Sequence, residues 1–201
     1  MDKRRIFCYN YPEKSSKRGM HMKEKRADIV NITVTAICIA LLSVASYVVI
    51  PLPFTPVVLS MHTVAVNLVG LIMKPKNAAY TMIIYLVMGC IGLPVFSAGT
   101  GGAGKLFGPT GGFYFGFLFA VIAISLLKGK EISLKRYILV TVAVGIPIQY
   151  LFGMMFMLLH NGGSLTAAAP LLTLIPTDIV KAVIASTAGV VLNKRLTGWK
   201  S

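Results

Sequence analysis

The sequence has few charged residues, and almost all of them carry the same sign. Only 13% of the 201 residues are charged and only 6 are acidic, whereas 56% are hydrophobic. Soluble domains have about a quarter charged residues and about half apolar ones. This chain is therefore too apolar for a soluble globular domain, and its composition is typical of an integral membrane protein.

Motifs of catalysis and of metal binding are also lacking. Cys8, Cys38 and Cys90 show no C-x-x-C spacing, so neither a disulfide framework nor a zinc site is indicated, and we interpret them as packing residues. There is no H-E-x-x-H, G-x-S-x-G or paired-carboxylate pattern, so we expect neither an enzyme nor a resident cofactor or metal. Residues 99–106 nearly spell a phosphate-binding loop, but Leu106 replaces the hydroxyl residue that would hold magnesium, so no ATPase is predicted.

Six apolar runs follow a basic N-terminal segment. They cover residues 29–50, 57–73, 77–94, 111–127, 137–159 and 170–192. A transmembrane helix needs about 20 apolar residues, and each run is near that length. We therefore predict an all-α membrane protein with six transmembrane helices. Residues 1–26 are expected to form a mobile basic tail or extension, and residues 27–197 one transmembrane domain.

The positions of the basic residues predict how these helices are oriented. Cytoplasmic loops carry the excess of Lys and Arg, and of the 20 such residues only Lys105 and Lys181 lie outside the tail, the alternate connections and the C-terminal end. Both termini are therefore expected in the cytoplasm, with the chain in the cytoplasmic membrane. The net charge of +14 then reflects topology in a lipid bilayer, not a nucleic-acid partner.

The three connections on the opposite face are rich in Gly and Pro. They are residues 51–56, 97–112 and 160–166. Glycine lets the backbone approach a ligand closely, and proline fixes the local direction of the chain. Two interpretations stay open for this face, a lid over a ligand site and a set of tight external turns.

Asp178 and Lys181 are the only strongly ionisable residues well inside a predicted span. Each charge costs about 2.5 to 3.5 kcal/mol near the bilayer centre, so such residues mostly face a protein interior and mark a site. Their spacing of three places both on one helical face. Two interpretations stay open: an ion pair that neutralises itself, and a ligand site. Both are true if a bound ligand separates the two side chains and offers them its own donors and acceptors.

Three ordered motifs resemble the BioY family of biotin transporters. They are Tyr85-Leu-Val-Met-Gly-Cys-Ile-Gly-Leu-Pro-Val-Phe96, Gly108-Pro-Thr-Gly-Gly-Phe113 and Asp178-Ile-Val-Lys181, and the loop Pro51-Leu-Pro-Phe-Thr-Pro56 is similar too. The resemblance runs through all six predicted helices and leaves only the tail outside. It implies the substrate-binding S component of an energy-coupling factor (ECF) transporter, a six-helix fold. Such a component captures biotin and works with a transmembrane coupling subunit and two cytoplasmic ATPases.

The resemblance also implies roles for particular residues. The acid and the lysine of the sixth helix hold biotin in family members, which implies that role for Asp178 and Lys181. An Asp carboxylate matches the two ureido N–H groups of biotin and a Lys ammonium its ureido carbonyl, while the valerate carboxylate would point to loop N–H groups or Lys105. The small-x-x-x-small pattern of the first helix contacts the coupling subunit in the family, which implies an interface at Ala36 and Ala40.

Three further positions are candidate ligand contacts. His62 stands where many relatives have Gln, and Ser97 or its neighbours stand where some relatives have Asn. Tyr85 is either a wall for the bicyclic ring of biotin or an ordinary packing residue. Two other functions stay open: an S component for a different small vitamin, because the pocket and not the fold decides the substrate, and, more remotely, a membrane-embedded enzyme.

Overall fold

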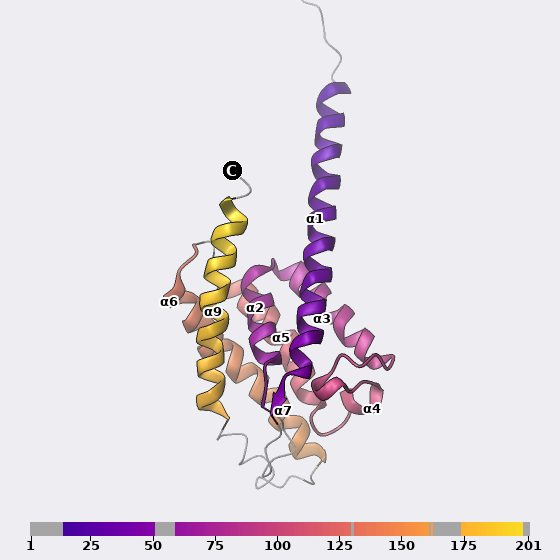
Figure 1. The fold of residues 1–201 in the computed structure, drawn as a ribbon, viewed down its shortest axis with the longest axis vertical. Helices are drawn as coiled ribbons and strands as arrows, with labels where there is room; N and C mark the ends of the chain where they lie inside the picture. The colour runs from indigo at the N-terminus through magenta and orange to yellow at the C-terminus, as the bar shows by residue number, and fades with distance from the viewer. Residues whose placement is uncertain (1–13, 51–58, 130, 161, 163–173, 199–201) are drawn as a thin grey trace, which may run out of the picture. The chain divides into compact units, whose positions relative to one another are not determined.

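Figure 1 shows the fold as a computed structural model, which describes residues 14–50, 59–129, 131–160, 162 and 174–198. The chain forms two compact units that divide between Val34 and Thr35, inside the first helix. The second unit contains every other described element and all of the candidate site residues.

The first helix, α1 (Lys14–Tyr47), begins inside the predicted basic tail. Its first turns contain Lys, Arg, Glu and Met, which are strong helix formers, so a helix is favoured there before the apolar run begins. The division of the chain at residue 26 into a tail and a transmembrane domain stays a prediction. The apolar part, Ile29–Tyr47, is long enough to cross a membrane.

Leu59 and Ser60 of the predicted run 57–73 form a strand, but the other described residues of the remaining predicted runs lie mostly in helices. These are α2 (His62–Ile72), α3 (Pro75–Cys90), α5 (Gly111–Leu127), the continuous segment of α6 (Leu134–Val140), the π-helix η2 (Thr141–Gly145) and α7 (Ile146–His160), and finally α9 (Ile175–Gly198). Leu134–His160 and Ile175–Arg195 are also long and apolar enough to cross a membrane, whereas α2 and α5 are shorter apolar helices. The chain is therefore a multi-pass, predominantly helical membrane protein.

The connections contain short elements that the apolar pattern does not predict. Strands β1 (Val49–Ile50) and β2 (Leu59–Ser60) pair antiparallel, with Val49 opposite Ser60. The 3-10 turn η1 (Ser97–Gly99) and α4 (Ala103–Leu106) lie in the predicted glycine-rich connection. The predicted connection at 51–56, and all of 160–166 except residues 160 and 162, lie outside the described residues.

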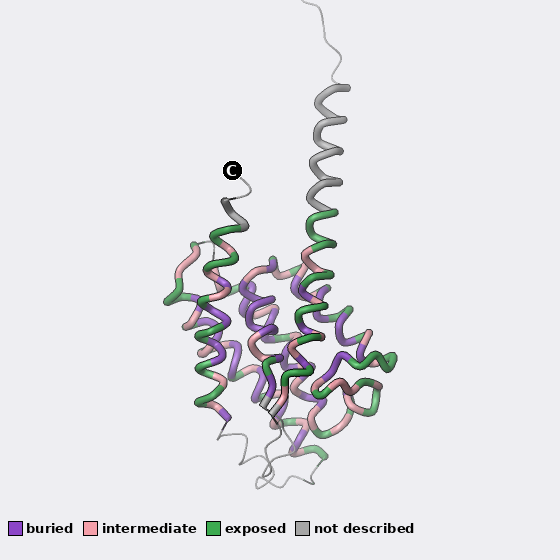
Figure 2. The backbone as a smooth tube through the Cα atoms, in the orientation of Figure 1, coloured by how far each residue is buried: buried purple, intermediate pink, exposed green. Residues whose placement is uncertain are grey.

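Helix α5 is the centre of the second unit. It packs against α7, α2 and α3, and α2 packs in turn against α9. Figure 2 shows buried positions running through these central helices. On α5, Gly112 and Gly116 form a small-x-x-x-small pattern: a Cβ atom at Gly112 would overlap the carbonyl oxygen of Phe152, and one at Gly116 would lie 3.0 Å from the Cα of Gln149. Glycine at these positions therefore lets α5 and α7 approach closely.

Polar side chains donate hydrogen bonds to the backbone carbonyls at the C-terminal end of α2. Lys128, just after α5, donates from Nζ to the carbonyl oxygens of Leu71 at 2.7 Å and Met73 at 2.6 Å. Ser125 Oγ also donates to the Met73 carbonyl at 2.6 Å, and Asn193 Nδ2 donates to that of Leu71 at 2.9 Å. The last carbonyls of a helix have no partner within it, so these donors join α5 and α9 to the end of α2. Burial lowers the pKa of Lys128 to about 8.

Candidate functional site

The predicted charged pair meets a third residue between α7 and α9. Asp178 lies in the first turn of α9, and Lys181 Nζ lies 3.0 Å from its Oδ1. Tyr150 of α7 donates from its hydroxyl to Asp178 Oδ2 at 2.6 Å. Each carboxylate oxygen therefore accepts one hydrogen bond from a different helix position, and the spacing-based prediction that both charges share one face is correct.

The pair is nearly enclosed by the protein. Only 12% of the Asp178 side chain and 11% of the Lys181 side chain is exposed. Charges removed from water need a partner of opposite charge and further hydrogen bonds, which Lys181 and Tyr150 supply to Asp178. The N-terminal turn of α9 also favours a negative charge, because the helix dipole is positive there. A carboxylate has about four lone-pair sites, so two remain for additional donors.

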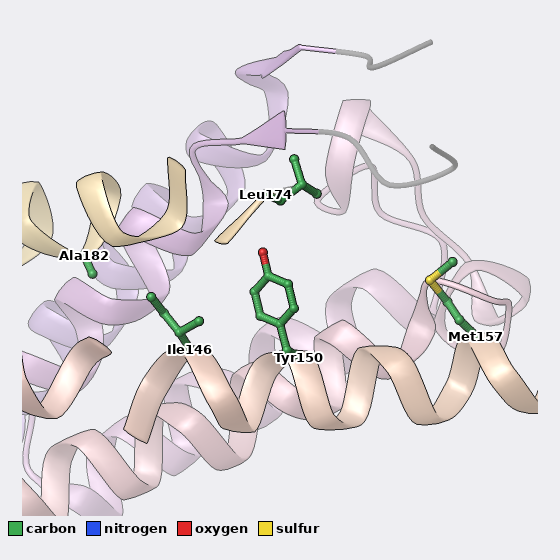
Figure 3. Close-up of a cluster of buried hydrophobic side chains, with 5 residues drawn as sticks. All are labelled: Ile146, Tyr150, Met157, Leu174 and Ala182. Carbon is green, nitrogen blue, oxygen red and sulfur yellow. The ribbon is translucent and has the colours of Figure 1, made fainter. Parts of the chain in front are cut away.

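An apolar cluster surrounds the Tyr150 ring. Figure 3 shows that Tyr150 projects from α7, between Ile146 and Met157, with its hydroxyl directed toward Leu174. Phe113 of α5 contacts the ring edge to face, with centroids 6.3 Å apart. The charged pair therefore lies beside an apolar wall, a combination that suits a ligand with both a polar and a hydrophobic part.

A second group of candidate residues lies in an aromatic cluster between α2, α3 and α5. The His62 ring lies 5.3 Å from Tyr85, 6.1 Å from Tyr114 and 4.9 Å from Phe117, measured between centroids. His62 and Tyr85 have no exposed surface, and neither ring nitrogen of His62 has a hydrogen-bond partner among the residues that the structure describes. The Phe96 ring packs against Tyr114 at 4.3 Å and Tyr85 at 5.9 Å.

Ser97 connects this aromatic cluster to the loop after α3. Its backbone N–H donates to the Tyr114 hydroxyl at 3.0 Å, and that hydroxyl lies 3.3 Å from Ser97 Oγ. Ser97 itself is half-buried. The structure thus brings His62, Tyr85 and Ser97 together around Tyr114.

The two groups are neighbours through α5. Phe113 contacts Tyr150 of the charged group, and the next residue, Tyr114, contacts His62 and Ser97 of the aromatic cluster. Among the described residues, no hydrogen bond or ring contact joins Asp178 or Lys181 directly to the aromatic cluster. Lys105, expected near a ligand carboxylate, lies half-buried in α4.

Several residues of these two groups were missed from the sequence. Tyr150 and Tyr114 lie in apolar runs, where a tyrosine is usually a packing residue. The signal that could have indicated such a residue is the charged pair itself, because a buried carboxylate needs further hydrogen-bond donors. Buried Gln149 donates to Asn67 Oδ1 at 3.3 Å and was missed as well. Within the described residues, no group of three His, Cys, Asp or Glu side chains is placed to hold a metal.

The proposed interface residues lie on the outer side of α1. Ala36 and Ala40 are exposed, whereas Cys38 and Leu42 on the same helix are buried. The small-x-x-x-small face is therefore open for another helix to approach.

Together, the fold and the site define a class: a multi-pass helical membrane protein with a charged pair and an aromatic cluster enclosed between its helices. The sequence model of the BioY family matches residues 20–198, and the chain belongs to the BioY family. The resemblance drawn from the three motifs is thereby confirmed.

Individual relatives agree with this family. The chain is 33% identical to a probable biotin transporter BioY of Pyrococcus horikoshii over 177 residues, which are 88% of this chain and 99% of that protein. It is 37% identical to the biotin transporter BioY of Thermotoga maritima over 114 residues, which are 57% of this chain and 66% of the relative. The fold is similar to a crystal structure of the S-component for biotin from an ECF-type ABC transporter, with a TM-score of 0.77 and 24% identity. That match covers 84% of this chain and 93% of the other.

Proposed function

We propose that this protein binds biotin and takes it up across the cytoplasmic membrane as the S component of an ECF transporter. The observation that carries the proposal is the Asp178–Lys181 pair, enclosed in an apolar span and held by Tyr150, in a chain of the BioY family. The full-length similarity to a BioY transporter supports the same function. The chain is a transport component and not an enzyme.

The charged pair suits the ureido group of biotin. Asp178 keeps lone pairs for the two ureido N–H donors, and Lys181 offers an ammonium to the ureido carbonyl. The apolar wall around Tyr150 suits the bicyclic ring and its chain. Ser97 is half-buried and is proposed as a direct contact, with the valerate carboxylate directed toward loop N–H groups or Lys105. His62 and Tyr85 are fully buried, so they reach the ligand only if the aromatic cluster opens.

Six membrane crossings with both termini in the cytoplasm form part of the proposal. The distribution of Lys and Arg supports this topology, because the connections assigned to the outside contain only Lys105. Asp178 then lies about one turn closer to the outer face than Lys181, so biotin arriving from outside meets the carboxylate first.

A transmembrane coupling subunit and two cytoplasmic ATPases are the proposed partners. The exposed Ala36 and Ala40 support an interface on α1, because small side chains let another helix approach. The sequence has no complete phosphate-binding loop, so the energy for transport would come from the partner ATPases.

Substitution of the pair tests the site. Asp178→Asn and Lys181→Met should each abolish measurable biotin binding to purified protein, whereas Glu131→Gln and Lys135→Met, at exposed positions just before and at the start of α6, should bind like the parent. Binding by either pair variant as tight as that of the parent would show that this pair does not hold the ligand.

A further inference from the structure

Three tyrosine hydroxyls from three helices hold the backbone of one short loop. Tyr47 of α1 donates to the Pro94 carbonyl at 2.7 Å, and Tyr85 of α3 donates to the Val95 carbonyl at 2.6 Å. The Tyr114 hydroxyl of α5 accepts from the Ser97 N–H at 3.0 Å. Nearly every residue of the stretch 94–97 is therefore fixed from outside the loop.

The loop that these tyrosines hold is tight and strained. The Phe96 N–H donates to the Thr100 carbonyl at 2.8 Å, and Thr100 Oγ1 donates back to the Ser97 carbonyl at 2.8 Å. Between them, Ala98 has a φ of 60°, in the left-handed region that side chains rarely adopt. Such strain persists only where surrounding contacts over-determine the conformation. The contacts of the three tyrosines are of that kind.

Tyr47 differs from the other two tyrosines in its accessibility. Tyr85 and Tyr114 are 0% and 3% exposed and belong to the aromatic cluster, whereas Tyr47 is 56% exposed. Its ring also packs directly on the loop, because a Cβ atom at Gly99 would lie 2.7 Å from Tyr47 Cε1. The contacts of Tyr47 with the loop can therefore break without disturbing the buried aromatic cluster.

We propose that Tyr47 is a positioning residue for the ligand site, whose hydroxyl and ring hold the loop 94–100 so that Ser97 is presented to the ligand. The proposal rests on the proposed function, in which Ser97 contacts biotin. It also links that site to the proposed coupling face, because Tyr47 follows Ala40 by about two turns of α1. A movement of this helix would reach the ligand loop through the contacts of Tyr47 with Pro94 and Gly99.

Binding kinetics on the full chain test this role. Tyr47→Phe removes the hydroxyl and keeps the ring on Gly99, and the biotin dissociation rate should rise about two- to tenfold, as expected for the loss of one hydrogen bond. The thermal midpoint should stay unchanged, because the lost contact lies outside the core. Tyr80→Phe is the matched control, since Tyr80 is 63% exposed on α3 and has no hydrogen bond in the described structure. If Tyr47→Phe does not fold, Tyr47→Leu removes both the hydroxyl and the ring and should raise the dissociation rate at least as much.

Hydrogen exchange gives a readout that needs no ligand. Amide exchange at Phe96 should be faster in Tyr47→Phe than in the parent and unchanged in Tyr80→Phe. If the parent binds biotin but Tyr47→Phe matches Tyr80→Phe in dissociation rate, the positioning role is wrong while the proposed function stands. If the parent does not bind biotin, the proposed function is wrong, and exchange at Phe96 decides whether Tyr47 holds the loop. Unchanged exchange would then overturn the inference as well.

Discussion

The charged pair leads to a prediction that separates its contribution to stability from its role in binding. Asp178→Asn leaves the Lys181 ammonium only 11% exposed and without its carboxylate, and Lys181→Met leaves the Asp178 carboxylate 12% exposed with Tyr150 alone. Removing one partner of a buried pair costs about 3 to 5 kcal/mol. Because both side chains keep some exposure to solvent, we expect each single substitution to lower the free energy of unfolding by about 3 kcal/mol.

The double variant Asp178→Asn/Lys181→Met should be about 2 kcal/mol more stable than either single variant, because replacing both charges removes the unpaired ion. Unfolding in mixed detergent micelles measures these free energies, and biotin binding is measured on the same preparations. We expect the double variant to regain stability and still not bind biotin. Additive losses of stability would refute the energetic coupling, and biotin binding by the double variant would refute the ligand role.

Two further predictions concern the packing of the helices. Gly112→Ala should destabilise the protein by about 1 to 3 kcal/mol, because the new methyl group overlaps the Phe152 carbonyl at the α5–α7 contact, and a lowered thermal midpoint would confirm this. A variant as stable as the parent would show that the two helices have room to separate. The second prediction concerns the pH dependence of stability. Burial lowers the pKa of Lys128 to about 8, so between about pH 8 and 10.5 the Lys128 side chain is protonated in the unfolded chain and deprotonated in the native protein. Stability should rise with pH across this window in the parent, and this part of the rise should be absent in Lys128→Met. Identical pH profiles would contradict the assignment.

The helices could be predicted from the sequence because their signal is local. An apolar run must form a helix in a bilayer to satisfy its own backbone, so the runs locate α2, α3, α5 and α9 within a few residues wherever the structure describes them. The contact between Asp178 and Lys181 was equally predictable, since a spacing of three on one helix fixes its geometry.

The contacts between helices could not be predicted in the same way. Tyr150 donates to Asp178 across 28 positions and Tyr47 to Pro94 across 47, and no periodicity within a helix specifies which faces meet. The two-residue ladder of β1 and β2 also depends on tertiary contacts, because two-residue strands are too short to show an alternating pattern. The enclosure of His62 among aromatic rings also depends on contacts between helices, so it was not evident from the predicted position of His62 near the external end of a helix.

The central claim, selective capture of biotin, is tested most directly by equilibrium binding to the detergent-purified protein. Labelled biotin is offered to the parent and to Asp178→Asn, with biocytin, thiamine and riboflavin as competitors. We predict saturable biotin binding to the parent that neither thiamine nor riboflavin displaces and that Asp178→Asn loses. If folded parent protein did not bind biotin but bound another of these vitamins, the account would be contradicted. The substrate assignment would then be wrong, whereas the fold assignment would still stand.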